Sequence, residues 1–450
     1  MTIQLPPFAA LVLERLHQSG FAAYVVGGCV RDSLLGRTPG DWDITTDALP
    51  EQVHRALAPM TVLDTGLAHG TVTAVIDRQR LEITTFRVDG AYRDHRRPDS
   101  VTFTRELRDD LARRDFTVNA MAYAPGEGLT DPFGGQADLR QGLLRAVGDA
   151  DARFQEDALR ILRGLRFAAV LGFSIEEETA ASMHRQKDLL LQLAPERIQA
   201  ELCSLLTARQ ATEVLRQYRD IFAVILPEIA PMFDFDQRNR HHIYDVWEHT
   251  LHAFATVPEN LALRLAMLLH DSGKPACFSL DAAGSGHFYG HPGVSARLAE
   301  QALTRLRFPT ELTERVVRLI ALHDSDLLPT EKSLLRWLRR LGEEELRLLL
   351  QVKRGDNRGQ SPVFDRSGQY DTVERLLDGL LTREPCFSRA QLSVRGGDVL
   401  ALGLSGPDIG KALDWLVEQV ISGALPNLRE PQLNALTAAL ADTSRANFLS

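Results

Sequence analysis

The stretch Tyr24-Val-Val-Gly-Gly-Cys-Val-Arg-Asp32, continued by Gly40-Asp-Trp-Asp-Ile-Thr45, decides how the first part of this chain folds. We read it as a strand that ends at two glycines, a short charged helix, and a second strand that carries Asp41 and Asp43. In an extended strand, side chains two residues apart point to the same side. Both carboxylates are therefore expected to face one spot, where hard oxygen ligands suit magnesium.

The glycine pair before the helix is typical of a loop that binds phosphate. Glycine lets a phosphate approach the backbone closely. Arg31 lies in the first turn after the loop, where its guanidinium offers a fork of donors. A lone Gly-Gly is usually a turn, and a lone Asp-x-Asp is usually a solvated strand end. The ordered combination instead predicts a metal site next to a triphosphate cradle.

This stretch resembles the head of the tRNA nucleotidyltransferases and bacterial poly(A) polymerases, a branch of the polymerase-beta-like nucleotidyltransferases. In that group, the Gly-Gly-x-Val-Arg-Asp loop and the Asp-x-Asp pair bind the incoming nucleotide and two metal ions. The resemblance implies two Mg²⁺ ions as cofactors. It implies nucleotide or metal binding for Gly27, Gly28, Arg31, Asp32, Asp41 and Asp43.

Length and composition place the chain among ordinary globular proteins. It has 450 residues, 44% hydrophobic and 25% charged, which suggests about three domains. Its four cysteines have no metal-like spacing and the N-terminus has no secretion pattern, so we expect a reduced, cytoplasmic compartment. No apolar run approaches ~18 residues, so no membrane span is expected.

The charge is acidic overall but locally basic. A formal net charge of −9 argues against a surface that is basic throughout. Binding of nucleic acid depends on local patches, and seven arginines lie between residues 93 and 114. This stretch is either such a patch or a solvated charged loop.

Residues 71–76 and 80–87 are expected to form a hairpin around Asp77-Arg78-Gln79. In the second segment, Leu81 and Ile83 alternate with Glu82, which therefore points away from the apolar side. Glu82 is either a third metal carboxylate or a side chain that faces water.

The polar stretch 88–100 has no core pattern, and a loop of this length is often a functional element. It resembles the flexible loop of the tRNA nucleotidyltransferases. That resemblance implies a part in the switch to ATP, because enzymes that add only CC are described as lacking this loop.

The segment Arg113-Arg-Asp-Phe-Thr-Val-Asn-Ala120 is expected to start an apolar helix. Asp115 can simply cap that helix. The segment also resembles the second motif of the family. That resemblance implies that Arg114 grips the triphosphate and that Asp115 or Asn119 contacts the ribose.

The segment Glu156-Asp-Ala-Leu-Arg-Ile-Leu-Arg-Gly-Leu-Arg-Phe167 is expected to be one long helix. Asp157 and Arg160, three residues apart, are neighbours on its surface and can form an ordinary ion pair. Alternatively they form a protein template. Asp157 would accept from the amino group of cytosine or adenine, and Arg160 would donate to the ring nitrogen. Uracil and guanine present the opposite order, which leaves an acceptor facing an acceptor.

The same segment resembles the Glu-Asp-x-x-Arg motif of the CCA-adding enzymes. Arg163 and Arg166 continue the three-residue spacing and can contact phosphates or stack beside the base. A later segment, Ala194-Pro-Glu-Arg-Ile-Gln-Ala-Glu-Leu202, resembles the next motif. That resemblance implies that Glu196 and Arg197 support the templating helix.

Histidines and aspartates recur between residues 241 and 324. Neutral imidazoles and carboxylates together make a good site for a divalent transition metal. The pattern resembles the HD phosphohydrolase superfamily, with His291 near the phosphate. The resemblance implies metal binding by His249, His270, Asp271 and Asp324, and hydrolysis of phosphate monoesters or cyclic phosphates.

The sequence therefore predicts an α+β protein. Its parts are a nucleotidyltransferase head with a mixed sheet (1–147), a helical neck (148–235), an HD domain (236–335) and a helical tail (336–450). The tail resembles that of bacterial tRNA nucleotidyltransferases, which implies a grip on the tRNA elbow.

The predicted function is addition of CCA to tRNA 3′ ends from CTP and ATP. Alternatives in the same class are an enzyme that adds only the terminal A and a poly(A) polymerase. A different class is an HD phosphohydrolase whose head only binds nucleotide. A non-catalytic RNA-binding protein is disfavoured, because both sets of metal ligands look intact.

Overall fold

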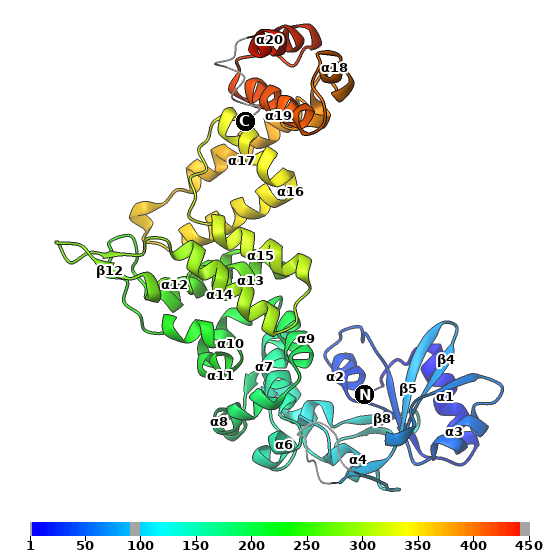
Figure 1. Ribbon diagram of the computed structural model, residues 1–450. Coiled ribbons are helices and arrows are strands. Elements are labelled where there is room, and N and C mark those ends of the chain that lie inside the picture. The colour runs from blue at the N-terminus through cyan, green and yellow to red at the C-terminus, as the bar shows by residue number, and fades with distance from the viewer. Residues whose placement is uncertain (1, 91–99, 442–450) are drawn as a thin grey trace. The chain divides into compact units, whose positions relative to one another are not determined.

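The structure, a computed structural model, describes residues 2–90 and 100–441. Its contacts divide the chain into two compact units (Figure 1). Unit 1 comprises Met1–Ala230 and Ala302–Phe308, and unit 2 comprises Pro231–Gln301 and Pro309–Ser450. This division falls inside the predicted neck, and the four-part domain organisation stays a prediction.

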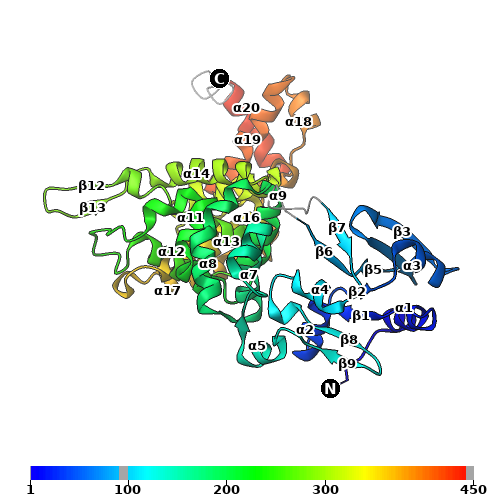
Figure 2. The same cartoon turned by 90° about the horizontal axis from the view of Figure 1, so that it is seen from below.

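A seven-stranded mixed sheet forms the centre of unit 1, in the order β3-β4-β5-β2-β1-β8-β9 (Figure 2). β2 and β5 are parallel, and the other neighbouring pairs are antiparallel. The strands are β1 (Ala23–Val26), β2 (Asp43–Thr46), β3 (Thr61–Gly66), β4 (Thr71–Ile76), β5 (Gln79–Thr85), β8 (Ala122–Ala124) and β9 (Gly128–Thr130). The helices of this part are α1 (Pro7–Gln18), α2 (Gly28–Leu34), α3 (Pro50–Ala56), α4 (Leu107–Ala112) and α5 (Gly135–Gln141). The predicted mixed sheet is confirmed.

Local patterns explain two of these strands. β1 is buried at all four positions, as its apolar run predicts. β5 alternates between buried Leu81 and Ile83 and exposed Glu82. β4 and β5 form the predicted hairpin, and its turn consists of Asp77 and Arg78, both with positive φ.

The apolar segment after Asp115 is not the predicted helix. Thr117–Asn119 form a single 3-10 turn, and β8 then pairs with β1 inside the sheet. Residues 120–124 are all buried. A short, continuously apolar run has the same pattern in a buried strand as in a buried helix, so periodicity alone does not separate the two.

The rest of unit 1 is mainly helical. Its helices are α6 (Ala150–Glu156), α7 (Leu159–Leu171), α8 (Glu177–Gln186), α9 (Pro195–Leu206), α10 (Ala211–Gln217) and α11 (Arg219–Ile225). The predicted helix over residues 156–167 is broken at Asp157, which has an extended φ of −138°. The Asp157 carboxylate accepts from the Leu159 backbone N–H at 3.1 Å, so it caps the second helix instead of continuing the first. Two short strand pairs complete the unit, β6 (Arg87–Asp89) with β7 (Val101–Phe103) and β10 (Leu143–Leu144) with β11 (Ser174–Ile175).

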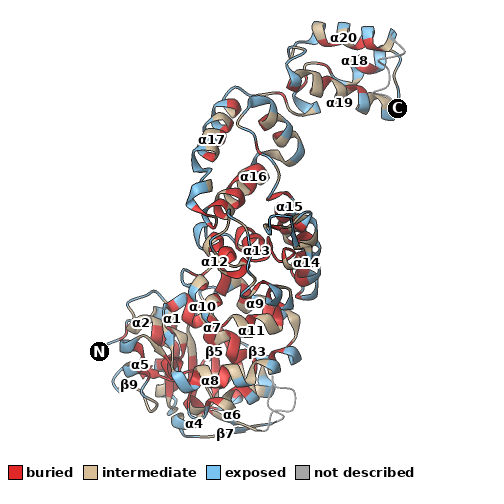
Figure 3. Cartoon of the chain, turned by 90° about the vertical axis from the view of Figure 1, so that its left-hand side faces the viewer, coloured by how far each residue is buried: buried red, intermediate tan, exposed pale blue. Residues whose placement is uncertain are grey.

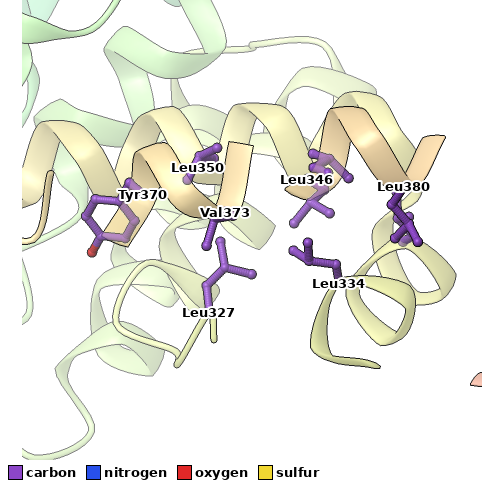
Figure 4. Close-up of a cluster of buried hydrophobic side chains, with 9 residues drawn as sticks. Leu327, Leu334, Leu346, Leu350, Tyr370, Val373 and Leu380 are labelled. Atoms are coloured by element: carbon purple, nitrogen blue, oxygen red, sulfur yellow. The ribbon is translucent and has the colours of Figure 1, made fainter. Parts of the chain in front are cut away.

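Unit 2 is helical apart from the pair β12 (Ser279–Leu280) and β13 (Gly286–His287). Its helices are α12 (Val246–Thr256), α13 (Leu261–Leu269), most of α14 (His291–Arg305), α15 (Thr310–Leu322), α16 (Glu331–Arg358), α17 (Ser367–Leu381), α18 (Gly396–Ala401), α19 (Pro407–Ser422) and α20 (Arg429–Ala441). α13 is the most buried of these helices (Figure 3). Figure 4 shows an apolar cluster in which Leu334, Leu346 and Leu350 of α16 meet Val373 of α17. In the part of the chain that is described, no helix is both long and apolar enough to cross a membrane.

Candidate functional site

The acidic residues of the head lie on neighbouring strands. The parallel register of β2 and β5 places Asp43 beside Glu82. Asp41 is exposed and precedes β2, which begins at Asp43, so the predicted strand holds only the second aspartate. Burial raises the pKa of Asp43, Arg114 acts in the opposite direction, and the Glu82 and Asp41 carboxylates raise it further. Because these acids repel one another, a cation is favoured between them.

The carboxylates of the head do not converge on a single point. Among the described residues, groups of metal-ligand atoms within 4.8 Å of one another occur in unit 2, and none is formed by Asp41, Asp43 and Glu82. The head therefore brings two predicted metal residues into register and leaves Asp41 just outside the strand.

Arg114 lies against the backbone of the glycine pair. Gly27 has a φ of +83°, and a Cβ built there would stand 2.9 Å from an Nη1 of Arg114. A side chain at this position would displace the guanidinium, and the positive φ favours glycine. Because Gly27 is the N-cap of α2, this contact places the Arg114 charge at the start of the predicted phosphate-binding helix.

Asp110, which sequence reasoning missed, forms an ion pair with Arg114. Its fully buried carboxylate accepts from Thr45 Oγ1 at 2.9 Å and lies 3.6 Å from Nη2 of Arg114. It also pairs with Arg113 at 2.8 Å. Burial alone would raise the pKa of Asp110, but the two guanidinium groups hold it below its ordinary value. The carboxylate stays charged and fixes both arginines.

A string of hydrogen bonds joins the phosphate-binding helix to α7. Arg31 donates to Asn119 Oδ1 at 2.7 Å, and Asn119 Nδ2 donates to Asp115 Oδ1 at 3.0 Å. Arg163 of α7 then donates to Asp115 Oδ2 from both Nε (2.8 Å) and an Nη (2.6 Å). Burial alone would raise the pKa of Asp115, but Arg163 and Asn119 hold it well below its ordinary value. Four of the predicted nucleotide-binding residues thus meet in one network.

Phe167 is a shared contact of three predicted arginines. The guanidinium carbons of Arg31, Arg163 and Arg166 lie 5.0, 5.4 and 4.1 Å from the centre of its ring. The ring is buried and meets Phe116 edge to face. An aromatic face attracts cations, so Phe167 aligns these side chains.

Asp157 and Arg160 do not pair with each other. Arg197 of α9 donates to Asp157 Oδ2 at 2.9 Å, which is the support predicted from the resemblance. Arg160 donates to Glu156 at 2.6 Å and to the carbonyl oxygens of Arg153 and Arg113. The ion-pair alternative for Asp157 and Arg160 is therefore wrong for this conformation.

α9 contacts α7 at a second point. Glu201 accepts from Nε of Arg166 at 2.5 Å.

Asp32 pairs with Arg31 at 2.8 Å and orients it from the exposed side of α2. The predicted flexible loop lies largely outside the described residues, since residues 91–99 are not described.

Unit 2 contains a buried cluster of histidines and aspartates. One group comprises His249, His270, Asp271 and Asp356, and an adjoining group comprises Asp271, His291 and His323, each with its ligand atoms within 4.8 Å. In the first group, Asp271 Oδ2 lies 3.2 Å from Nε2 of both His249 and His270. Asp356 Oδ1 lies 3.0 Å from His249.

Asp324, predicted as the fourth ligand, belongs to neither group of close ligand atoms, whereas Asp356 belongs to the first, and the role of Asp324 stays a prediction. His323 has helical backbone angles and turns its ring into the cluster. The neighbouring Asp324 lines the same cavity as Asp271, His291 and His323. It also lines a cavity of about 260 Å³ together with Lys353 and Arg366.

The buried acids make this cluster attractive to positive charge. Burial lowers the pKa of His270, but Asp271 and Asp356 outweigh it and raise the pKa to about 10. Burial and the charge on His270 lower the pKa of His323 to about 3, which keeps that ring neutral. Neutral imidazole and carboxylate are the forms that bind metals.

Comparison with known proteins places this geometry in a family. The model for the Poly A polymerase head domain matches residues 23–145, and the model for the probable RNA- and SrmB-binding site of polymerase A matches residues 172–233. A CCA-adding enzyme from Levilactobacillus brevis is 35% identical over 437 residues, which cover 96% of each chain. The chain belongs to the CCA-adding enzyme family.

A second relative aligns over about half of its length, and solved structures align over nearly all of theirs. A CCA-adding enzyme from Geobacillus thermodenitrificans is 49% identical over 212 residues, which cover 47% of this chain and about half, 52%, of that relative. The crystal structure of the Bacillus stearothermophilus CCA-adding enzyme in complex with CTP matches 99% of this chain and 100% of that chain, with a TM-score of 0.72 and 28% identity. A Thermotoga maritima CCA-adding enzyme complexed with tRNA, 20% identical with a TM-score of 0.61, shows the same fold.

Membership of the CCA-adding family accounts for the order of the motifs along the head and neck. Sequence reasoning missed Asp110, Glu201 and Asp356. Glu201 and Asp356 contact residues far from them in the chain, whereas Asp110 contacts Arg113 and Arg114, three and four residues away. A signal did exist for Asp110, since it directly precedes the Leu-Ala-Arg-Arg-Asp115 stretch.

Proposed function

We propose that the chain is a cytoplasmic enzyme that adds C, C and A to tRNA 3′ ends from CTP and ATP. The observation that carries this proposal is the arrangement at the start of α2. There, Asp43 and Glu82 lie in register, and Arg114, which acts on Asp43, lies against Gly27. The full-length similarity to a CCA-adding enzyme supports it.

The reaction joins a nucleotide to the RNA end. The RNA 3′ hydroxyl oxygen attacks the α-phosphorus of the nucleoside triphosphate, the bond to the β-phosphate oxygen breaks, and pyrophosphate leaves. Arg114 lies where it neutralises charge on the triphosphate, and Asp110 keeps it there. Arg31, held by Asp32 and Asn119, supplies a second guanidinium on the same helix.

Asp41, Asp43 and Glu82 fit a magnesium site, because they are the oxygen ligands that magnesium prefers and Asp43 is destabilised by its acidic neighbours. Two magnesium ions, when bound, activate the RNA hydroxyl and stabilise charge on the triphosphate and pyrophosphate. Asp43 is half-buried at the strand start, so its carboxylate is fixed by β2, whereas Asp41 can adjust.

Asp157 and Arg160 would select the base as a protein template. Both are engaged within the protein, so cytosine or adenine would displace Arg197 from Asp157 and one carbonyl contact from Arg160. A wrong base sets the Asp157 carboxylate against a carbonyl oxygen and the Arg160 guanidinium against a ring N–H, at a cost of roughly 1–3 kcal/mol for each. Two such mismatches amount to a discrimination of about 30-fold to 10⁴-fold.

One extension assay separates the members of this enzyme class. Three RNAs are offered with CTP and ATP: tRNA ending before CC, tRNA ending in CC, and an unrelated RNA. Addition of CCA to the first supports the proposal. Extension by ATP of the second alone identifies an A-adding enzyme, and long A tails on the third identify a poly(A) polymerase.

A matched pair of variants tests the role of the acids. Asp43→Asn is expected to abolish incorporation of CMP. Asp77→Asn makes the same chemical change in the exposed β4–β5 turn, where asparagine tolerates the positive φ, and is expected to leave activity unchanged. Full incorporation by Asp43→Asn would refute the assignment.

A second activity, hydrolysis of phosphate monoesters or cyclic phosphates, is favoured by the buried group of His249, His270, Asp271 and Asp356. In this reaction a water oxygen bonds to phosphorus, the ester P–O bond breaks, and the alcohol leaves with a proton. A divalent transition metal bound by the four side chains supplies Lewis-acid activation. Phosphate release that needs added metal and is abolished by His270→Ala supports this activity, and release unchanged in His270→Ala excludes it.

The C-terminal tail is proposed to bind the RNA substrate. Residues 393–430 of the predicted tail would grip the tRNA elbow. Removing these residues is expected to weaken binding of tRNA more than binding of CTP.

A further inference from the structure

We infer that a cavity at the C-terminal end of α7 binds a nucleobase that carries an exocyclic amino group. The cavity has a volume of about 160 Å³, and the residues that line it all belong to unit 1. Ala168, in the last turn of α7, lines the cavity, whereas Arg160 lies in the first turn. The two residues are separated by about 12 Å along the helix axis. The cavity is therefore distinct from the proposed base-reading pair Asp157 and Arg160.

The backbone around the cavity is fixed by hydrogen bonds. The Gln210 N–H donates to the Ala169 carbonyl oxygen at 3.3 Å, which joins the start of α10 to α7. The Ser174 N–H donates to the Gly142 carbonyl oxygen at 2.9 Å, and β11 pairs with β10. Because these peptide groups are already paired, the side chains are the polar groups left to bind a ligand.

A tyrosine hydroxyl at this site has no partner. Tyr218 lines the cavity, is only 2% exposed, and its buried hydroxyl has no hydrogen-bond partner among the described residues. Its ring is held by His184 of α8, which stacks on it with 5.5 Å between the ring centres. Burial raises the pKa of Tyr218 to about 12, so the hydroxyl keeps its proton and can donate. A buried donor without a partner calls for a ligand or a bound water molecule.

One face of α10 supplies the polar edge of the cavity. Gln210, Glu213 and Gln217 line it, and their spacing of three and four residues places them on one side of the helix. All three are exposed, so a ligand reaches them from solvent. An amide offers both a donor and an acceptor, and a carboxylate accepts. This edge therefore matches a ligand whose own edge carries donors and acceptors.

The other walls are apolar, with Phe173, Ile175 and Val214 beside Ala168. Among the described residues that line the cavity there is no lysine or arginine, so it lacks the cations that bind phosphate. A flat heterocycle has apolar faces and polar edges. Proteins bind unstacked bases in such pockets through contacts with the ring faces and hydrogen bonds to the edges.

The carboxylate of Glu213 distinguishes between bases. It pairs with Arg216 at 2.8 Å, which keeps it charged and leaves it free to accept a further hydrogen bond. Adenine, cytosine and guanine offer it an amino group, whereas uracil has none. The same chemistry comes from two sources, a free nucleoside or an unpaired base within RNA.

Photo-cross-linking of the full-length protein tests the inference. The probe is 8-azidoadenosine, used as the free nucleoside or at one unpaired position of a short RNA. Trypsin cleaves after Arg209, Arg216 and Arg219, so mass spectrometry recovers a cross-link to α10 in peptides 210–216 or 217–219. We expect labelling of these peptides that adenosine suppresses and uridine does not, and the labelling probe identifies the source. Labelling confined to other peptides, no labelling, or equal suppression by uridine would overturn the inference.

Variants with a matched control locate the contacts. Glu213→Gln removes the carboxylate and Tyr218→Phe removes only the hydroxyl. Each is expected to raise the adenosine concentration that half-suppresses labelling by about two- to tenfold, the net worth of one hydrogen bond. Glu178→Gln makes the same change at another exposed glutamate paired with an arginine, Arg185 at 2.6 Å, and is expected to change nothing.

Two readouts keep the outcomes separate. Should Tyr218→Phe unfold the protein, as judged by circular dichroism, Glu213→Gln alone decides. A folded Glu213→Gln variant with wild-type labelling and wild-type suppression would refute the assignment. CMP incorporation is measured on the same preparations. Labelling of the cavity without incorporation would contradict the proposed function and support this site.

Discussion

Replacing Gly27 by alanine tests whether the backbone of the glycine pair seats Arg114. Gly27 has a φ of +83°, and the new Cβ would lie 2.9 Å from Arg114 Nη1, closer than such atoms normally approach. The backbone strain costs roughly 1–2 kcal/mol of folding free energy. The guanidinium must also shift, and a displacement of about 1 Å in an active site costs on the order of 100-fold in rate.

Gly20→Ala is the matched control. Gly20 has the same φ of +83°, but a Cβ there meets nothing within 4 Å. Gly27 has a ψ of −134°, outside the left-handed helical region, so Gly27→Ala is expected to lose more stability than Gly20→Ala in urea unfolding. Only Gly27→Ala should lose kcat/KM for incorporation of CMP, by about 100-fold or ~2.7 kcal/mol. Equal activity of the two folded variants would show that Arg114 is not held by this contact or does not act on the nucleotide.

Three further predictions concern the same sites. Gly28→Ala should leave folding intact, because the new Cβ would lie at an ordinary 3.7 Å from the nearest side chain, Arg31. It should raise KM for CTP about tenfold or more, ~1.4 kcal/mol, because a phosphate approaches the backbone there. An unchanged KM contradicts this prediction. Asp115→Asn should destabilise the protein by about 1–3 kcal/mol at pH 7. The pKa of Asp115 in the folded protein lies below its unfolded value near 3.8, so this loss of stability is present above that pH and fades as acid titrates the folded carboxylate. Urea unfolding at pH 7 and pH 3 measures the loss. An equal loss at both pH values would show that the charge of Asp115 is not its cause. Asp356→Ala should remove metal from unit 2, whereas Asp324→Ala should retain it, as measured by elemental analysis. Loss of metal in Asp324→Ala and its retention in Asp356→Ala would support the ligand set predicted from the sequence, which contains Asp324.

The sequence alone predicts the head well, because its decisive residues are close together in the chain. The strand at residues 23–26, the hairpin around residues 77–78 and the α+β class follow from local pattern. The break at Asp157 did not follow, since an aspartate can either continue a helix surface or cap a new helix, and tertiary contacts with Arg197 favour the second.

The metal cluster of unit 2 marks the limit of such prediction. His323-Asp324 repeats the His-Asp pattern of residues 270–271, but only its histidine belongs to a group of close ligand atoms. Asp356 lies within a charged helix end, Lys353-Arg-Gly-Asp-Asn-Arg358, where its spacing gives no hint of a metal. Only the packing of α12 against α16 brings it within 3.0 Å of His249.

The string of hydrogen bonds from Arg31 through Asn119 and Asp115 to Arg163 couples the proposed selection of the base to the proposed binding of the triphosphate. If these side chains act as proposed, a tilt of α7 that follows a poorly fitting base is transmitted through this string to the side chains that would bind the triphosphate. Fidelity is then expected to appear as slower turnover of a wrong nucleotide as well as weaker capture. Selection among nucleotides can thus continue after they have already entered the site.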